Sequence, residues 1–278
     1  MNALLALAAS VLWGSSDFGG GLISRKLHPS AAVLISQAIA LAGLLVLLPF
    51  LAVPGGWYRL TAAAAGVVAT LSLASFYRAM ADAPLSLVAP ITAAGTGIPV
   101  LVGLARGESL SAVQAAGIAV TIAGVILACG PEFRRGGVHV RRQAVIFAVL
   151  AAAGFGVAYT LLALAAGNGD LYGTLLLQRI GGLVVLTPLV LRAGILRQVT
   201  LTARRLAALA AIGISDIVAN GSYALAASRG DLAVAAVLAS LYPVVTALLA
   251  RGVLAERLRP VQSMGVVAAL GGVILLST

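Results

Sequence analysis

The sequence predicts an all-α membrane protein with ten transmembrane helices, arranged as two inverted five-helix repeats. Two observations carry this prediction. Of the 278 residues, 61% are hydrophobic and only 9% are charged, whereas soluble domains average roughly 25% charged residues. In addition, a pattern that begins at Glu108 returns in the same register from Glu256. A pattern that closes each half of the chain indicates that one structural unit occurs twice.

The apolar segments are long enough to cross a bilayer, which takes roughly 20 residues of α-helix. The first of them lacks a basic start and a clear cleavage site, so we expect a retained span instead of a signal peptide. Ten segments meet the length: about 2–23, 30–53, 61–81, 84–105, 110–130, 142–166, 170–191, 204–228, 232–252 and 259–277.

The repeat divides the chain into two domains, 1–137 and 138–278, with five predicted spans in each. Because five is an odd number, the second unit must enter the membrane from the opposite side. Carriers built from such inverted repeats commonly hold their substrate between the two halves, near the middle of the bilayer. One chain completes this two-fold unit, so a monomer is sufficient, and the sequence leaves a homodimer open.

The net charge of +10 does not indicate a nucleic-acid-binding protein, because the arginines lie in short connectors and form no continuous stripe. Most of them lie in the connectors before spans two, four, six, eight and ten. This bias places that face in the cytoplasm and both termini outside. Cys129 is the only cysteine, and His28 and His139 lie in connectors, so we expect no disulfide, no metal site and no cofactor.

Charged residues within a span are costly when they face lipid, which makes them candidates for a functional site. Arg179 lies near the middle of the seventh span and Asp216 near the middle of the eighth. Asn220 and Tyr223 follow Asp216 at helical spacing and share its face. Two interpretations are open. Arg179 and Asp216 form an internal ion pair between two spans, or they line a cavity in which Arg179 meets a substrate carboxylate or phosphate and Asp216 an amine or a proton.

Asp17 is a third charge, near the end of the first span and one helical turn after Trp13. It either reaches the headgroups beside Arg25 and Lys26 or faces inward, where it could bind a cation or carry a proton.

Four tyrosines lie inside the predicted spans: Tyr77, Tyr159, Tyr223 and Tyr242. Either each of them is hydrogen-bonded to a neighbouring helix, or together they form an amphipathic pocket wall.

Three prolines within spans are candidate hinges or gating elements, or else static kinks, since a proline weakens a helical turn. Pro90 and Pro99 lie in the fourth span, and Pro243 lies in the ninth.

Together these features resemble the EamA family of the drug/metabolite transporter superfamily. The resemblance rests on the ten spans in two halves, on Trp13-Gly14-Ser15-Ser16 in the first span, and on the repeated Glu-x-Leu-x-x-x-Gln-x-x-Gly pattern, followed by Gly-Val-Ile-Leu. Members of this family are often drawn with cytoplasmic termini, opposite to the charge bias. The resemblance implies a central cavity lined by Trp13, Asp17, Tyr77, Thr96, Tyr159, Asp216, Asn220, Tyr223 and Tyr242.

The predicted function is that of a secondary active transporter in the cell membrane, or inner membrane. It would export or exchange a small polar or amphipathic metabolite, amino-acid-like or drug-like, by alternating access, with Asp17 and Asp216 as candidate proton-coupling residues. The alternative is a passive channel or facilitator. An intramembrane enzyme is disfavoured, because the sequence places no nucleophile with a base and no metal-ligand motif at this depth.

Overall fold

The computed structural model describes residues 1–24, 26–47, 56–82, 88, 91–128, 142–167, 170–254 and 260–276. All regular secondary structure in these residues is helical, which confirms the all-α prediction. The first half contains α1 (Asn2–Ser24), α2 (Pro29–Leu47), α3 (Tyr58–Asp82), the 3₁₀ helix η2 (Ala94–Thr96), α5 (Gly97–Ala105) and α6 (Ala112–Ala128). The second half contains α7 (Arg142–Ala166), α8 (Leu171–Arg192), η3 (Ile195–Gln198), α9 (Ala203–Arg229), α10 (Leu232–Ala239), α11 (Tyr242–Leu254) and α12 (Pro260–Leu276).

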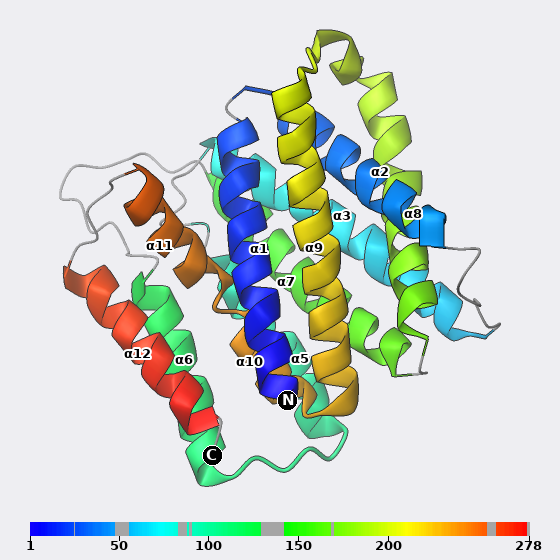
Figure 1. The fold of residues 1–278 in the computed structure, drawn as a ribbon. Coiled ribbons are helices and arrows are strands. Elements are labelled where there is room, and N and C mark those ends of the chain that lie inside the picture. Colours follow the sequence, from blue (N-terminus) through cyan, green and yellow to red (C-terminus); the bar gives the residue numbers. More distant parts are fainter. Residues whose placement is uncertain are drawn as a thin grey trace.

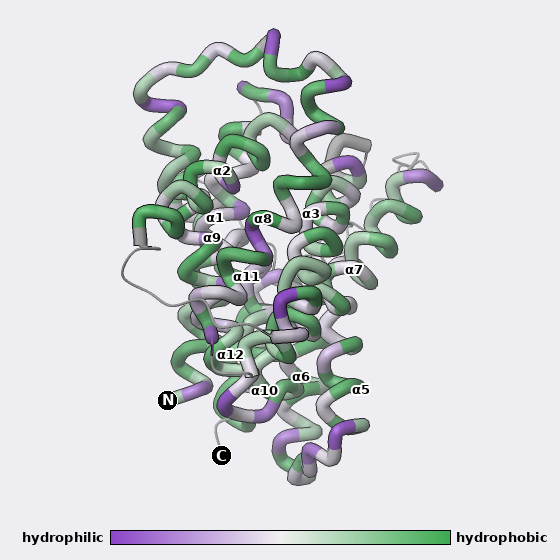
Figure 2. The backbone as a smooth tube through the Cα atoms, turned by 90° about the vertical axis from the view of Figure 1, so that its right-hand side faces the viewer, coloured by the Kyte–Doolittle hydropathy of each residue, from purple (hydrophilic) through white to green (hydrophobic). Residues whose placement is uncertain are grey.

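The outer surface of the bundle is apolar. Val184 and Val267 are 65% and 72% exposed, and the hydrophilic residues gather mainly at the two ends of the bundle (Figure 2). Such surfaces are rare on soluble monomers, so the chain is an integral membrane protein. Helices long and apolar enough to cross a membrane are Pro29–Val46, Tyr58–Phe76, Arg142–Ala166, Leu171–Arg192 and Ala203–Arg229. Shorter apolar helices are Ile91–Ala105, Ala112–Leu127, Leu232–Thr246 and Pro260–Leu276. The total of ten spans therefore stays a prediction.

Several helix ends follow directly from local sequence. The Asp170 carboxylate caps α8 by accepting a hydrogen bond from the Gly173 N–H at 2.8 Å. α2 and α12 begin at Pro29 and Pro260, where the missing N–H of proline has no intrahelical role. Gly194 follows the end of α8 in the left-handed conformation, with φ of 65°, which glycine adopts without steric cost.

The predicted fourth and ninth spans are not continuous α-helices. η2 precedes α5 in the fourth, and a turn at Ser240 and Leu241 separates α10 from α11 in the ninth. Pro99 and Pro243 lie in the first turns of α5 and α11, where proline is tolerated because the first N–H groups of a helix need no intrahelical acceptor. The two prolines therefore mark the starts of new helical segments. The third predicted hinge, Pro90, lies outside the described residues.

Helices from the two halves pack against each other at several places in the molecule. α1 packs against α9, α3 packs against α7 and α8, and α6 packs against α12 (Figure 1). Two of the close contacts depend on glycine. A Cβ atom on Gly66 would overlap the carbonyl oxygen of Gln178, and one on Gly95 would overlap that of Ala152. Small residues thus let α3 approach α8, and η2 approach α7, where lipid supplies no hydrophobic drive for association.

The start of the first helix and the end of the last helix lie at the same end of the bundle. The Asn2 Nδ2 group donates a hydrogen bond to the carbonyl oxygen of Arg229 at 2.9 Å, so α1 begins beside the end of α9. α1 begins and α12 ends at the same end of the molecule (Figure 1).

Candidate functional site

A pocket lies among α1, α2, α3, α7, α8, α9 and α11, at the middle of α8 and α9. It combines charged, amide and aromatic side chains with small residues of α3. Its walls are formed by Trp13, Asp17, Gln37, Gly66, Ala69, Thr70, Leu73, Phe76, Phe155, Tyr159, Gln178, Arg179, Asp216, Asn220 and Tyr242.

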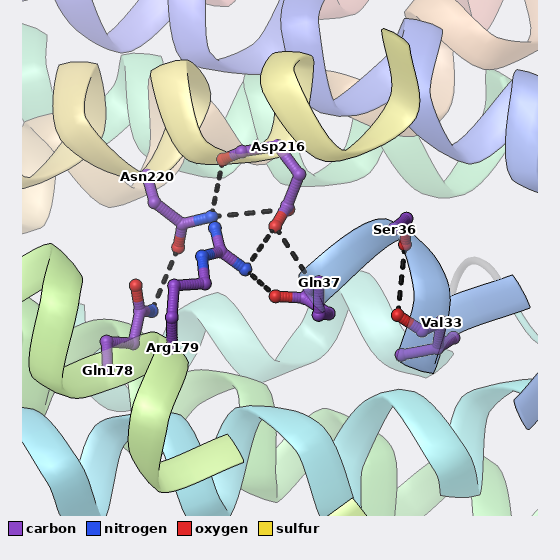
Figure 3. Close-up of polar contacts among 7 residues, drawn as sticks. All are labelled: Val33, Ser36, Gln37, Gln178, Arg179, Asp216 and Asn220. Carbon is purple, nitrogen blue, oxygen red and sulfur yellow. Dashed lines mark hydrogen bonds and ion pairs between the residues drawn. The ribbon is translucent and has the colours of Figure 1, made fainter. Parts of the chain in front are cut away.

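An ion pair between α8 and α9 forms the polar centre of this pocket. The Arg179 Nη1 atom lies 2.7 Å from Asp216 Oδ2, and the two side chains are 5% and 22% exposed. Arg179 Nη1 also donates to Gln37 Oε1, and Gln37 Nε2 donates to Asp216 Oδ2 at 3.2 Å (Figure 3). A buried charge must be paired and hydrogen-bonded to be tolerated. The amide from α2 therefore completes the pairing by contacting both charged partners.

The network continues along α9. Asn220 Nδ2 donates to the backbone oxygen of Asp216 at 2.6 Å and to its Oδ1 atom at 3.2 Å. Gln178 Nε2 in turn donates to Asn220 Oδ1 at 3.1 Å, as Figure 3 shows. The Asp216 carboxylate is thus held by neighbours on three helices. The ion-pair and cavity interpretations of Arg179 and Asp216 are compatible, because the pair joins two helices and also lines the pocket.

The prediction from sequence missed Gln37 and Gln178 as site residues. Both lie within apolar segments that meet the length of a membrane span, and a polar residue in such a segment is a signal for an inward-facing position. Phe76 and Phe155 were also missed, and as apolar residues in apolar helices they carry no such signal.

Aromatic side chains form one wall of the pocket, next to the polar network. The Trp13 and Tyr159 rings stack with centroids 4.8 Å apart, and Phe155 stacks on Tyr159 at 5.9 Å with an interplanar angle of 8°. Tyr223 packs behind this wall, 5.6 Å from Trp13 and 5.5 Å from Tyr159. It is 1% exposed and is not among the residues that line the pocket. Tyr242, the first residue of α11, lines the pocket.

Two other residues predicted to line the cavity, Thr96 and Tyr77, are not among the described residues that line this pocket. Thr96 is buried in η2, and its hydroxyl group donates to the carbonyl oxygen of Ala93 at 2.8 Å. It therefore satisfies a local helical acceptor. Tyr77 belongs to α3, but its side chain lies outside the described residues.

Asp17 lies at the junction of two pockets. It lines the central pocket, and with Gln37 and Asp216 it also lines a second pocket, which extends between α1, α2 and α9 past Ile23 and Ala32. Asp17 is thus in the pocket wall and not at the end of α1. Among the described residues, no group of three His, Cys, Asp or Glu side chains is placed to hold a metal ion.

An integral membrane protein with a charged and aromatic pocket enclosed by apolar helices is the class that this fold and site define. Residues 142–278 match the model of the EamA-like transporter family, so the second half of the chain is an EamA domain. This match confirms the resemblance drawn from the sequence and identifies a transporter family.

The fold as a whole is also shared with a solved protein. A crystal structure superposes with a TM-score of 0.79 over 99% of this chain and 98% of the other, at 17% sequence identity. At that identity the likeness concerns the fold alone. A comparison with curated protein sequences produced no match.

Proposed function

We propose that the protein is a secondary active transporter that exports or exchanges a small polar or amphipathic metabolite across the cell membrane. The observation that carries the proposal is the buried Arg179–Asp216 pair in a pocket enclosed by apolar helices of an EamA protein. Charged side chains inside a membrane span are costly even when they are paired, and they commonly mark the path of a substrate or ion. One chain holds the whole pocket, which supports a monomeric carrier.

The proposed architecture is ten spans in two inverted repeats of five. The pattern of helix packing supports it. α1, the first helix of one half, packs against α9, the third span of the other; α7, the first helix of the second half, packs against α3, the third of the first. The fifth spans, α6 and α12, pack against each other. A two-fold axis between the halves would generate these reciprocal contacts.

The proposed mechanism is alternating access, in which the two halves move around the pocket. Interrupted helices near the substrate site are common in transporters with inverted repeats. Here the interruptions in the predicted fourth and ninth spans supply candidate hinges, and Tyr242, beside one of them, lines the pocket. Pro99 and Pro243 are the candidate hinge residues, because each lies at the start of a helical segment.

Asp17 and Asp216 are the candidate proton-coupling residues, since both carboxylates line the pocket and a coupled carrier needs a titratable group that substrate and proton share. The test uses purified protein in proteoliposomes. A substrate is first identified by thermal stabilisation across amino acids, sugars, organic cations and organic anions, and its exchange is then measured with and without a pH gradient. The double variant Asp17→Asn/Asp216→Asn should no longer show stimulation of exchange by the pH gradient. Stimulation that survives in the double variant rejects coupling through these residues.

The same proteoliposomes separate a carrier from a channel. A carrier shows saturable exchange that is accelerated by substrate on the opposite side, because each transport cycle requires a conformational change. Sustained ionic conductance at rates above those of such a cycle would instead establish the passive alternative.

A further inference from the structure

One edge of the Arg179 guanidinium group has no partner in the described part of the chain. Nη1 contacts Asp216 and Gln37, whereas Nε and Nη2 are buried and make no hydrogen bond to the described residues. Arg179 is 5% exposed and lines the central pocket. Buried charged donors are normally hydrogen-bonded. The two unpartnered donors of Arg179 therefore suggest that a ligand supplies the missing acceptors.

The free edge has the geometry of a carboxylate-binding site. Nε and Nη2 donate from the same side of the planar guanidinium, and this fork matches the two oxygens of a carboxylate group. A phosphate would bring up to two negative charges next to Asp17 and Asp216, so a monovalent carboxylate is favoured.

The rest of the pocket favours an aromatic body for this ligand. Trp13, Phe76, Phe155 and Tyr159 line the same pocket as Arg179. Their stacked and edge-to-face arrangement provides aromatic surface beside the polar network. Flat rings pack well against such side chains in offset or edge-to-face geometry.

We propose that the pocket binds an aromatic carboxylate, with its carboxylate on the Nε–Nη2 edge of Arg179 and its ring against the aromatic side chains. This inference rests on the proposed transport function and names the substrate class of the same pocket. It also fixes the effect of Asp17. At a pH where Asp17 is ionised, its charge and that of the ligand have the same sign, so neutralising Asp17 strengthens binding.

Calorimetric binding of phenylacetate to the purified full-length protein in lipid nanodiscs tests the proposal. Phenylacetate should bind at least about tenfold more tightly than 2-phenylethylamine, which replaces the carboxylate with an ammonium group, and than acetate, which lacks the ring. Arg179→Lys keeps a positive charge beside Asp216 but loses the fork, so it should weaken phenylacetate binding by about tenfold or more. Arg192→Lys is the matched control, since Arg192 is exposed at the end of the same helix.

Asp17→Asn, compared with the unmodified protein at an alkaline pH where Asp17 is ionised, provides a second measurement that does not depend on the arginine variants. Tighter phenylacetate binding supports the proposal; weaker binding, equal affinity in a folded Arg179→Lys variant, or preference for the amine overturns it. Exchange of another solute in proteoliposomes without phenylacetate binding rejects the aromatic carboxylate and leaves transport intact. Phenylacetate binding without exchange supports the ligand assignment and rejects the transport function.

Discussion

Glu108 Oε1 accepts a hydrogen bond from the backbone N–H of Leu232 at 2.8 Å, and Oε2 accepts one from Ala233 at 3.0 Å. Leu232 begins α10, so Glu108 supplies acceptors for two of the N–H groups that a helix start leaves free. The contact joins a connector of the first half to a helix of the second. Asp231, which precedes α10 directly, makes no such side-chain bond.

Glu108→Gln should lower the free energy of unfolding by about 1–2 kcal/mol. The amide retains a single acceptor oxygen and loses the favourable interaction of a negative charge with the helix start. Denaturant titration of the protein in detergent micelles measures the change. Asp231→Asn is the control, because it removes a charge at the same helix start without removing a hydrogen bond. Equal losses in the two variants would assign the effect to charge alone.

Arg179→Ala and Asp216→Ala should each destabilise the protein by about 3–5 kcal/mol, since each leaves a buried charged partner unpaired. The double variant should lose less than the sum of the two, by about 1–3 kcal/mol, because it removes both charges together. The same titration measures all three variants, with Arg192→Ala as an exposed control. Additive losses would contradict an energetic coupling across α8 and α9.

Gly66→Ala should destabilise the protein by about 1–3 kcal/mol, the usual cost of overpacking. The added methyl group would overlap the backbone of Gln178 and push α8 away from α3, displacing Arg179 with it. The unfolding temperature and the affinity for the ligand should both fall. Gly43→Ala in α2 is the control: no atom lies within 4 Å of the new methyl group, so its unfolding temperature should be unchanged or higher. Equal tolerance at both positions would contradict the close crossing.

Tyr223→Phe and Tyr172→Phe make the same chemical change with opposite expected results. The Tyr223 hydroxyl is buried without a partner among the described residues, so its removal should leave stability unchanged or raise it by about 1 kcal/mol. The Tyr172 hydroxyl donates to the carbonyl oxygen of Leu44 at 2.7 Å, one of the last four carbonyls of α2. Its removal should cost about 1 kcal/mol. Thermal unfolding of both variants, compared side by side, checks the difference in sign.

Several site residues could be predicted from the sequence because polar groups are rare in apolar helices. Arg179, Asp216 and Asn220 were predicted from their depth and helical spacing, and the structure brings them together around one pocket. Gln37 could not be joined to them by the same reasoning. It lies on α2, and no spacing within one helix reveals which residue of another helix it will meet.

The repeated motif also predicted one feature of the structure and missed another. Its recurrence at Glu108 and Glu256 indicated a duplicated unit, but it did not predict that Glu108 would cap α10, since the two lie far apart in the sequence. Glu256 lies outside the described residues. Pro99 and Pro243 were predicted as hinges or kinks, and the structure adds that each lies in the first turn of a helical segment.

The sequence by itself determined that the chain is helical, that it belongs in a membrane and that it resembles EamA transporters, because composition, segment length and motif order are properties of the chain alone. Only the tertiary structure decided which polar residues meet, which tyrosine lies behind the pocket wall and which guanidinium edge stays free. Helical periodicity assigns residues to a face of one helix. Which face meets which neighbour depends on steric fit between helices, set here by close approaches such as that of Gly66 to Gln178.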